Sequence, residues 1–162
     1  MLTLSEYVGQ EDLNLTDLNL SRNLIEGRGL KSLAEGLSRN RSIKKLWLSN
    51  NKIEDEGLDE LAKTLSLRNQ CIEELYLSAN IINCAGITKF AEFLPHNKCL
   101  KVLDVSKNII GNYGLARFSA KLKLNKGITH IDFHRNKELN NSENDEEGLR
   151  EFARCLADNT WL

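Results

Sequence analysis

The chain repeats itself, and this repetition restricts its possible folds more than any other feature of the sequence. Five nine-residue segments share the pattern L-x-x-L-x-L-x-x-N, with Ile, Val or Phe replacing some of the leucines: LTDLNLSRN, IKKLWLSNN, IEELYLSAN, LKVLDVSKN and ITHIDFHRN. They begin at residues 15, 43, 72, 100 and 128, so successive starts lie 28 or 29 residues apart. A fixed period of this length indicates a solenoid, in which each unit covers the apolar face of its neighbour.

Each unit predicts a short strand followed by a helix. The first part alternates apolar and polar residues, which is the strand period. Its two inward columns are Leu18, Leu46, Leu75, Leu103, Ile131 and Leu20, Leu48, Leu77, Val105, Phe133. The second part has a glycine and then apolar residues at i, i+3, i+4 and i+7, which lie on one face of a helix. The glycines that open these helical patterns are Gly29, Gly57, Gly86, Gly114 and Gly148. The first and last apolar columns after them are Leu30, Leu58, Ile87, Leu115, Leu149 and Leu37, Leu65, Leu94, Leu122, Leu156.

One asparagine recurs at the end of each predicted strand. The column is Asn23, Asn51, Asn80, Asn108 and Asn136. A buried amide has two donor hydrogens and an acceptor oxygen, so it can bond the loop backbones of its own and the next repeat. We therefore interpret this column as a structural ladder and not as a catalytic row.

The whole chain, residues 1–162, is interpreted as one domain. Residues 1–14 do not fit the repeat and could form a short N-terminal cap. Leu162 falls where the first core residue of a sixth repeat would lie, and no polar capping unit follows Asn159. Because solenoids need polar caps at both ends, we expect either a longer array or an end that docks on a partner, including end-to-end self-association.

These motifs resemble the ribonuclease-inhibitor-like subfamily of leucine-rich-repeat proteins, from Leu15 to the C-terminus. The resemblance implies an α/β solenoid: a curved right-handed β-α superhelix with a parallel sheet on the concave side and helices on the convex side. It also implies a protein-binding module or scaffold. The subfamily includes GTPase activators and cytoskeletal regulators, so a regulatory role is the alternative, as is a fragment of a larger protein. Fold alone does not decide between them.

Composition excludes several other classes. The 22 basic and 23 acidic side chains nearly balance, which argues against a nucleic-acid binder. No nucleophile–base pair, phosphate loop or CxxC motif is present, so we expect no enzyme activity, no cofactor and no metal. The sequence contains no secretory signal and no membrane-length apolar run, which predicts a cytoplasmic protein with reduced cysteines that does not bind membranes.

The predicted binding residues are the strand residues that face the concave side. They are Lys45, Trp47, Glu74, Tyr76, Asp104, His130, Asp132 and His134. Trp47 and Tyr76 would be neighbouring exposed aromatics, which often dominate interface energy. The alternative is that they only pack against the long side chains of Lys45 and Glu74.

Three further features leave alternatives open. The set His130, Asp132 and His134 could bind a divalent metal, although side chains two positions apart along a strand do not readily converge, so polar surface is favoured. The acidic insertion 137–147 is either a solvated loop, a partner contact or a weak cation site. If the protein activates a GTPase, the loop-edge residues to test are Arg22, Asn50, Lys107 and Arg135.

Overall fold

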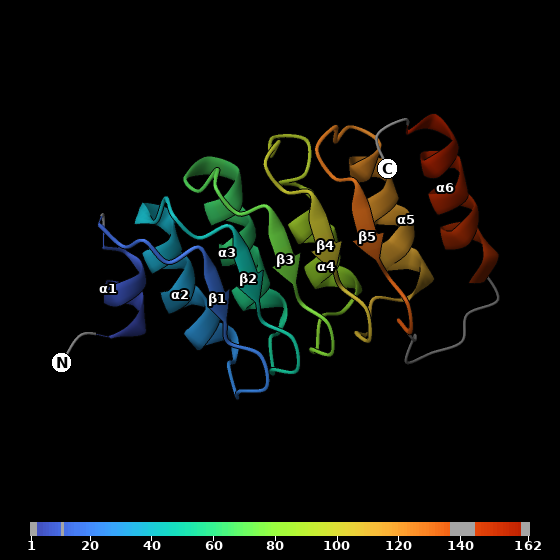
Figure 1. The fold of residues 1–162 in the computed structure, drawn as a ribbon. Coiled ribbons are helices and arrows are strands. Elements are labelled where there is room, and N and C mark those ends of the chain that lie inside the picture. The colour runs from blue at the N-terminus through green and yellow to red at the C-terminus, as the bar shows by residue number, and fades with distance from the viewer. Residues whose placement is uncertain (1–2, 11, 137–144, 160–162) are drawn as a thin grey trace.

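The computed structural model describes residues 3–10, 12–136 and 145–159, in which a parallel sheet lies on one side and helices lie on the other (Figure 1). The strands are β1 (Asp17–Asn19), β2 (Lys45–Trp47), β3 (Glu74–Tyr76), β4 (Val102–Asp104) and β5 (His130–Asp132). The helices are α1 (Leu4–Val8), α2 (Gly27–Arg39), α3 (Asp55–Leu67), α4 (Cys84–Ala91), α5 (Gly111–Leu122) and α6 (Asp145–Asp158). The predicted leucine-rich-repeat architecture is confirmed.

The sheet follows the repeat one unit at a time. Its strand order is β1-β2-β3-β4-β5, and every strand begins two residues after its repeat. The register keeps equivalent residues side by side, so that Leu46 pairs with Leu75 and Leu75 with Leu103. All three leucines are fully buried against the helices. The inward column expected from the alternation is therefore present.

The helices begin two or three residues before the glycines that were expected to open them. Each glycine lies instead in the first turn, and those from Gly57 onward meet the helix of the preceding repeat. A Cβ on Gly57 would lie 2.8 Å from the Cα of Gly27 in α2, which is closer than real Cβ contacts come. The glycine column thus permits close packing of neighbouring helices.

The third repeat departs from the others because its helix is short. α4 has 8 residues, whereas α3 has 13. Pro95 follows four residues after α4 ends, and proline has no N–H to continue the helical bonding and disfavours helical backbone in the residue before it. Leu94, expected on the helix, lies in the following turns but is still fully buried.

The two ends of the stack differ. At the N-terminal end, α1 packs on α2, Val8 is fully buried, and the Asn40 side chain donates to the Val8 carbonyl over 2.9 Å. At the other end, the apolar stripe of α6 is only partly covered: Leu149 is 57% exposed and Leu156 41% exposed. The equivalent leucines of the earlier repeats are buried because the helix of the next repeat covers them.

The predicted asparagine column forms a ladder of hydrogen bonds. Asn80 is representative: its Nδ2 donates to the carbonyls of Leu77 (2.9 Å) and Leu48 (3.0 Å), and its Oδ1 accepts from the Ile53 N–H (3.1 Å). Leu48 and Ile53 belong to the preceding repeat, not to the next one, which corrects the expected direction. Asn23, in the first repeat, donates only to its own loop at Leu20 and Ser21.

A second asparagine ladder, which the sequence analysis did not identify, lies at the other end of the strands. Its members Asn40, Asn69, Asn97 and Asn125 are at most 2% exposed. The Asn69 amide donates to the Leu37 carbonyl of the preceding repeat (2.8 Å) and accepts from the Ile72 N–H of its own (3.2 Å). Each member stands three residues before the first core residue of a repeat, so the 28- or 29-residue period could have revealed the column.

Candidate functional site

The predicted binding residues lie on the exposed sheet face, defined here as the strand side chains that point away from the helices. The strand register aligns them across the sheet (Figure 1). The row with the largest side chains reads Asn19, Trp47, Tyr76, Asp104, Asp132 from β1 to β5. The row beside it reads Asp17, Lys45, Glu74, Val102, His130. The structure thus brings all of the predicted residues except His134 onto these two rows, and His134 lies in the turn after β5.

Trp47 and Tyr76 form a stacked pair in the middle of this row. Their ring centroids are 5.4 Å apart and their planes differ by 2°. Both side chains are only partly buried. The pair therefore presents a flat apolar surface that the fold itself holds in place.

A polar network supports the aromatic pair. The Tyr76 hydroxyl donates to Glu74 over 2.7 Å, and Lys45 forms an ion pair with Glu74 at 2.9 Å. Burial, followed by the hydrogen bond to Glu74, raises the pKa of Tyr76 to about 12. The hydrogen bonds from Lys45 and Tyr76 hold the pKa of Glu74 below its ordinary value. Glu74 and Lys45 thus orient the Tyr76 hydroxyl. Partner binding by the aromatic pair stays a prediction, as does its alternative, that the two rings only pack against Lys45 and Glu74.

The β4 and β5 end of the row is acidic. Asp104 accepts from the Ser106 N–H at 2.9 Å, and Asp132 accepts from both the backbone N–H and the ring of His134 at 2.8 Å. Burial of Asp132 acts in the opposite direction, but the two His134 bonds hold its pKa below the ordinary value. Both carboxylates are therefore held in place through one oxygen.

The two histidines do not converge on one point. The His130 ring lies 3.0 Å from the Thr129 hydroxyl, whereas the His134 ring bonds Asp132. Within the described ranges, no three His, Cys, Asp or Glu side chains are arranged to hold a metal ion. The geometry therefore favours polar surface for this set. The acidic insertion 137–147 falls almost entirely outside the described residues.

A hollow of about 600 Å³ opens beside Tyr76 at the acidic end of the sheet. Its polar wall includes Asp104, His130 and Asp132, and its apolar wall includes Phe152 and Leu156 of α6. It therefore joins the exposed sheet face to the partly covered end of the stack. The strand residues follow from the sequence pattern, but the hollow does not, because α6 contributes to it from a segment about twenty residues further along.

The loop edge beyond the strands has an unusual backbone. Arg22, Asn50, Ala79, Lys107 and Arg135 have φ angles of 54–60°, and each directly precedes a ladder asparagine. This left-handed conformation is uncommon for residues other than glycine. It recurs in every repeat because the chain must reverse sharply to return the asparagine beneath its strand. The basic members are exposed, but Ala79 interrupts the row.

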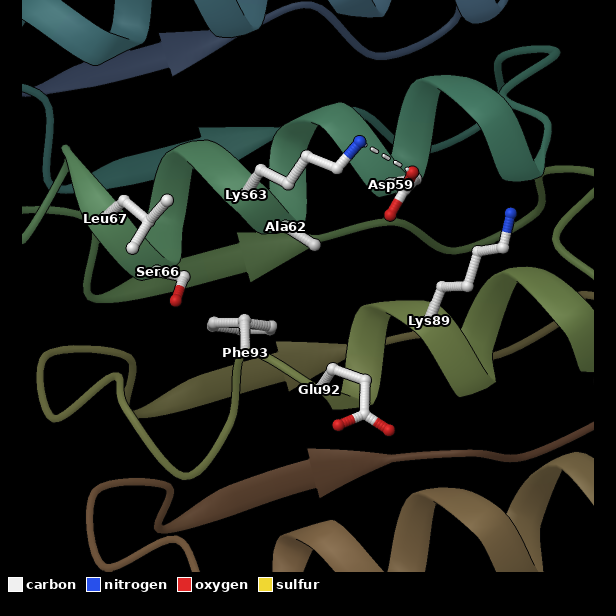
Figure 2. Close-up of a pocket in the computed structure, with 8 residues that line it drawn as sticks. All are labelled: Asp59, Ala62, Lys63, Ser66, Leu67, Lys89, Glu92 and Phe93. Atoms are coloured by element: carbon white, nitrogen blue, oxygen red, sulfur yellow. Dashed lines mark ion pairs between the residues drawn. The ribbon is translucent and has the colours of Figure 1, made fainter.

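A second concavity lies on the helical side. Figure 2 shows a groove between α3 and α4, with Phe93 opposite Ser66 and Leu67 and with Lys63 paired to Asp59 at its rim. Its volume is about 390 Å³. The groove exists because α4 ends early, which leaves the C-terminal turns of α3 partly uncovered and Leu67 78% exposed.

The described part of the chain contains no helix that is long and apolar enough to cross a membrane. The four cysteines all lie in the described ranges and form no disulfide: Cys155 is buried, and Cys71, Cys84 and Cys99 are half-buried.

Comparison with known proteins supports the repeat assignment. The family described as "Leucine Rich repeat" matches residues 12–34, 39–62 and 96–119. No curated protein matches the sequence. Among solved structures, the chain is similar to the leiomodin-1 actin-binding site 2 domain, with 22% identity, a TM-score of 0.75, and coverage of 94% of this chain and 87% of that one.

It is also similar to the tropomodulin C-terminal domain of Caenorhabditis elegans, with 16% identity, a TM-score of 0.71, and coverage of 96% and 93% of the two chains. At these identities the similarity establishes the fold and not the activity. The chain is therefore built from leucine-rich repeats and has the leucine-rich-repeat fold.

Proposed function

We propose that the chain is a non-catalytic protein-interaction module that binds its partner through the exposed sheet face, centred on Trp47 and Tyr76. The observation that carries the proposal is the stacked aromatic pair, which lies on a face that the described helices leave uncovered. Large aromatic side chains are enriched among the residues that dominate binding energy at interfaces. The repeat architecture is consistent with an assignment to the ribonuclease-inhibitor-like subfamily, and four cysteines that form no disulfide are consistent with a cytoplasmic location.

Affinity capture with matched variants tests the proposal. We expect the Trp47→Ala, Tyr76→Ala double variant to lose proteins that the wild type retains. We expect Trp47→Ala alone to weaken binding of a captured partner by about 2 kcal/mol or more, with little change in unfolding free energy. Tyr7→Ala is the control, because Tyr7 is an exposed aromatic (48%) on α1, away from the sheet. Unchanged capture by the double variant would refute the sheet-face assignment.

A second candidate is a cytoskeletal regulator that binds actin. The observation that favours it is the similarity, over 94% of the chain, to the leiomodin-1 domain named actin-binding site 2. Co-sedimentation with filamentous actin, and polymerisation assays with monomeric actin, test this directly. Actin binding that Trp47→Ala weakens would support both the sheet-face proposal and the role as an actin-binding regulator. The absence of binding in both assays would exclude actin and leave the general proposal standing.

Activation of a GTPase is a further regulatory alternative. The exposed loop-edge residues Arg22, Asn50, Lys107 and Arg135 are the side chains available for it. Stimulated GTP hydrolysis across a panel of small GTPases would support this role, and unchanged hydrolysis across the panel would count against it.

A further inference from the structure

The hollow beside Tyr76 has a wall of a particular chemistry. Tyr76 stacks on Trp47 through one ring face, on the β2 side. Its other face is directed toward β4, where the register places Asp104, followed by Asp132 on β5. One aromatic face and two carboxylates therefore line the same 600 Å³ hollow.

The negative charge of this wall is incompletely balanced. Asp104 and Asp132 lie side by side at strand spacing, about 4.8 Å. Their side-chain hydrogen bonds are to Ser106 and His134, and no lysine or arginine in the described ranges forms an ion pair with either carboxylate. Asp132 has two cationic neighbours: His134, which forms an ion pair with it when protonated, and Lys107, whose charge helps to lower the pKa of Asp132. Lys45, the cation on the neighbouring row, is paired with Glu74. No lysine or arginine of the described ranges lies within ion-pair distance of Asp104 or Asp132, so the wall is complementary to a cation that bonds both carboxylates.

We propose that this hollow receives an arginine side chain of the protein partner, with its guanidinium stacked on Tyr76 and hydrogen-bonded to Asp104 and Asp132. A guanidinium is planar, stacks on aromatic rings and donates several hydrogen bonds in a fixed fork, whereas an ammonium has neither the plane nor the fork. Two carboxylates alone provide few ligands for a metal ion. This inference rests on the proposed function and specifies the partner chemistry at one end of the sheet face.

The rest of the hollow has room for the partner residue that lies next to the arginine. Phe152 and Leu156 line its far side, and Leu156 is 41% exposed. An apolar residue of the same partner segment would cover these side chains. The partner segment that fits best therefore carries an arginine beside an apolar residue and crosses β5, the last strand of the sheet.

The direct test uses a small probe. N-acetyl-arginine methylamide is titrated into the ¹⁵N-labelled protein, with the citrulline analogue as an uncharged isostere and the lysine analogue as a second cation. We expect saturable amide shifts at Tyr76, Asp104 and Asp132 with the arginine probe, weaker shifts with lysine, and none with citrulline. Equal shifts with citrulline, or no shifts with arginine at these positions, would overturn the inference.

Variants that remove the charge then test whether the two carboxylates account for binding of the arginine probe. Asp104→Asn together with Asp132→Asn is expected to weaken arginine-probe binding roughly tenfold or more, since hydrogen bonds between charged groups are lost. The fold should tolerate the change, because Asn19 occupies this row in β1 and accepts the same type of loop N–H bond from Ser21 at 3.0 Å. Asp59→Asn together with Glu92→Gln, at the helical groove, removes the same charge elsewhere and should leave binding unchanged.

The two proposals fail in different ways. If the arginine probe does not bind but Trp47→Ala still abolishes partner capture, the arginine inference is wrong and the sheet-face function stands. If the probe binds as expected but the aromatic double variant captures partners normally, the hollow binds arginine and the proposed sheet-face function is wrong. Retained probe affinity in the Asp104→Asn, Asp132→Asn variant would contradict the inference whatever the capture result.

Discussion

Replacing Asn80 with alanine tests how much one ladder asparagine contributes to stability. Asn80 is 7% exposed and joins the third repeat to the second. Its loss does not affect all of its partners equally. The Leu48 carbonyl also accepts from Asn51 and the Leu77 carbonyl also accepts from Asn108, so both keep one bond. The Ile53 N–H, in contrast, loses the side-chain oxygen that it bonds.

The expected cost follows from this difference. A buried N–H left without a partner costs about 1–3 kcal/mol, and each carbonyl that loses one of two bonds adds about 0.5–1 kcal/mol. The sum centres on about 3.5 kcal/mol. For a chain of this length, 1 kcal/mol corresponds to about 2–4 °C, so the melting temperature should fall by about 7–14 °C.

Chemical and thermal unfolding followed by circular dichroism measure the effect. Asn23→Ala is the matched control, because Asn23 is exposed and bonds only its own loop; its cost should stay below about 1 kcal/mol. Asn80→Asp keeps the side-chain volume but removes the donor, and should destabilise at least as much as alanine. If Asn80→Ala melts with the wild type, or no lower than Asn23→Ala, the ladder does not stabilise the stack as argued.

Three further predictions concern the rest of the molecule. Asn69→Ala, in the second ladder, removes a fully buried amide and should destabilise at least as much as Asn80→Ala in the same denaturation assay; a smaller loss would contradict the role of that ladder. Gly36→Ala should lower the unfolding free energy by about 1–3 kcal/mol and speed hydrogen exchange in α1, because its Cβ would lie 2.4 Å from an α1 carbonyl oxygen. Gly27→Ala is the control and should be near neutral, because the nearest contact of its Cβ would be 3.5 Å away. Tyr76 should ionise near pH 12, and Glu74→Gln should bring its pKa closer to 10.0 in an absorbance titration. Because the folded-state pKa is raised, the contribution of Tyr76 to stability is complete below about pH 10 and is lost as pH rises toward 12. Ionisation of Tyr76 at the ordinary tyrosine pKa of 10.0 would contradict its burial and its hydrogen bond to Glu74.

Much of the fold could be predicted from local pattern alone. Leu46, Leu75 and Leu103 are buried because strand alternation and a constant period leave no other face for them. The aromatic and acidic strand residues were also located correctly on one surface, since the same alternation that buries one column exposes the next. No partner or energetic role follows from that placement alone.

Other features depend on the distances between repeats and on the residue at which each helix ends. The period could not determine that Asn80 bonds the preceding repeat, because both neighbours are equivalent in sequence. The early end of α4 creates the groove at Phe93, although a helical apolar pattern continues through Leu94.

The sequence by itself determined the repeat, the inward columns and the face on which Trp47 and Tyr76 lie, because these follow from side-chain periodicity within single elements. Tertiary structure decided that the two rings stack at 5.4 Å, that Asp104 and Asp132 share a hollow with α6, and that the last helix leaves Leu149 and Leu156 exposed. These features arise where side chains from different repeats meet, and the packing of whole repeats against one another sets those distances.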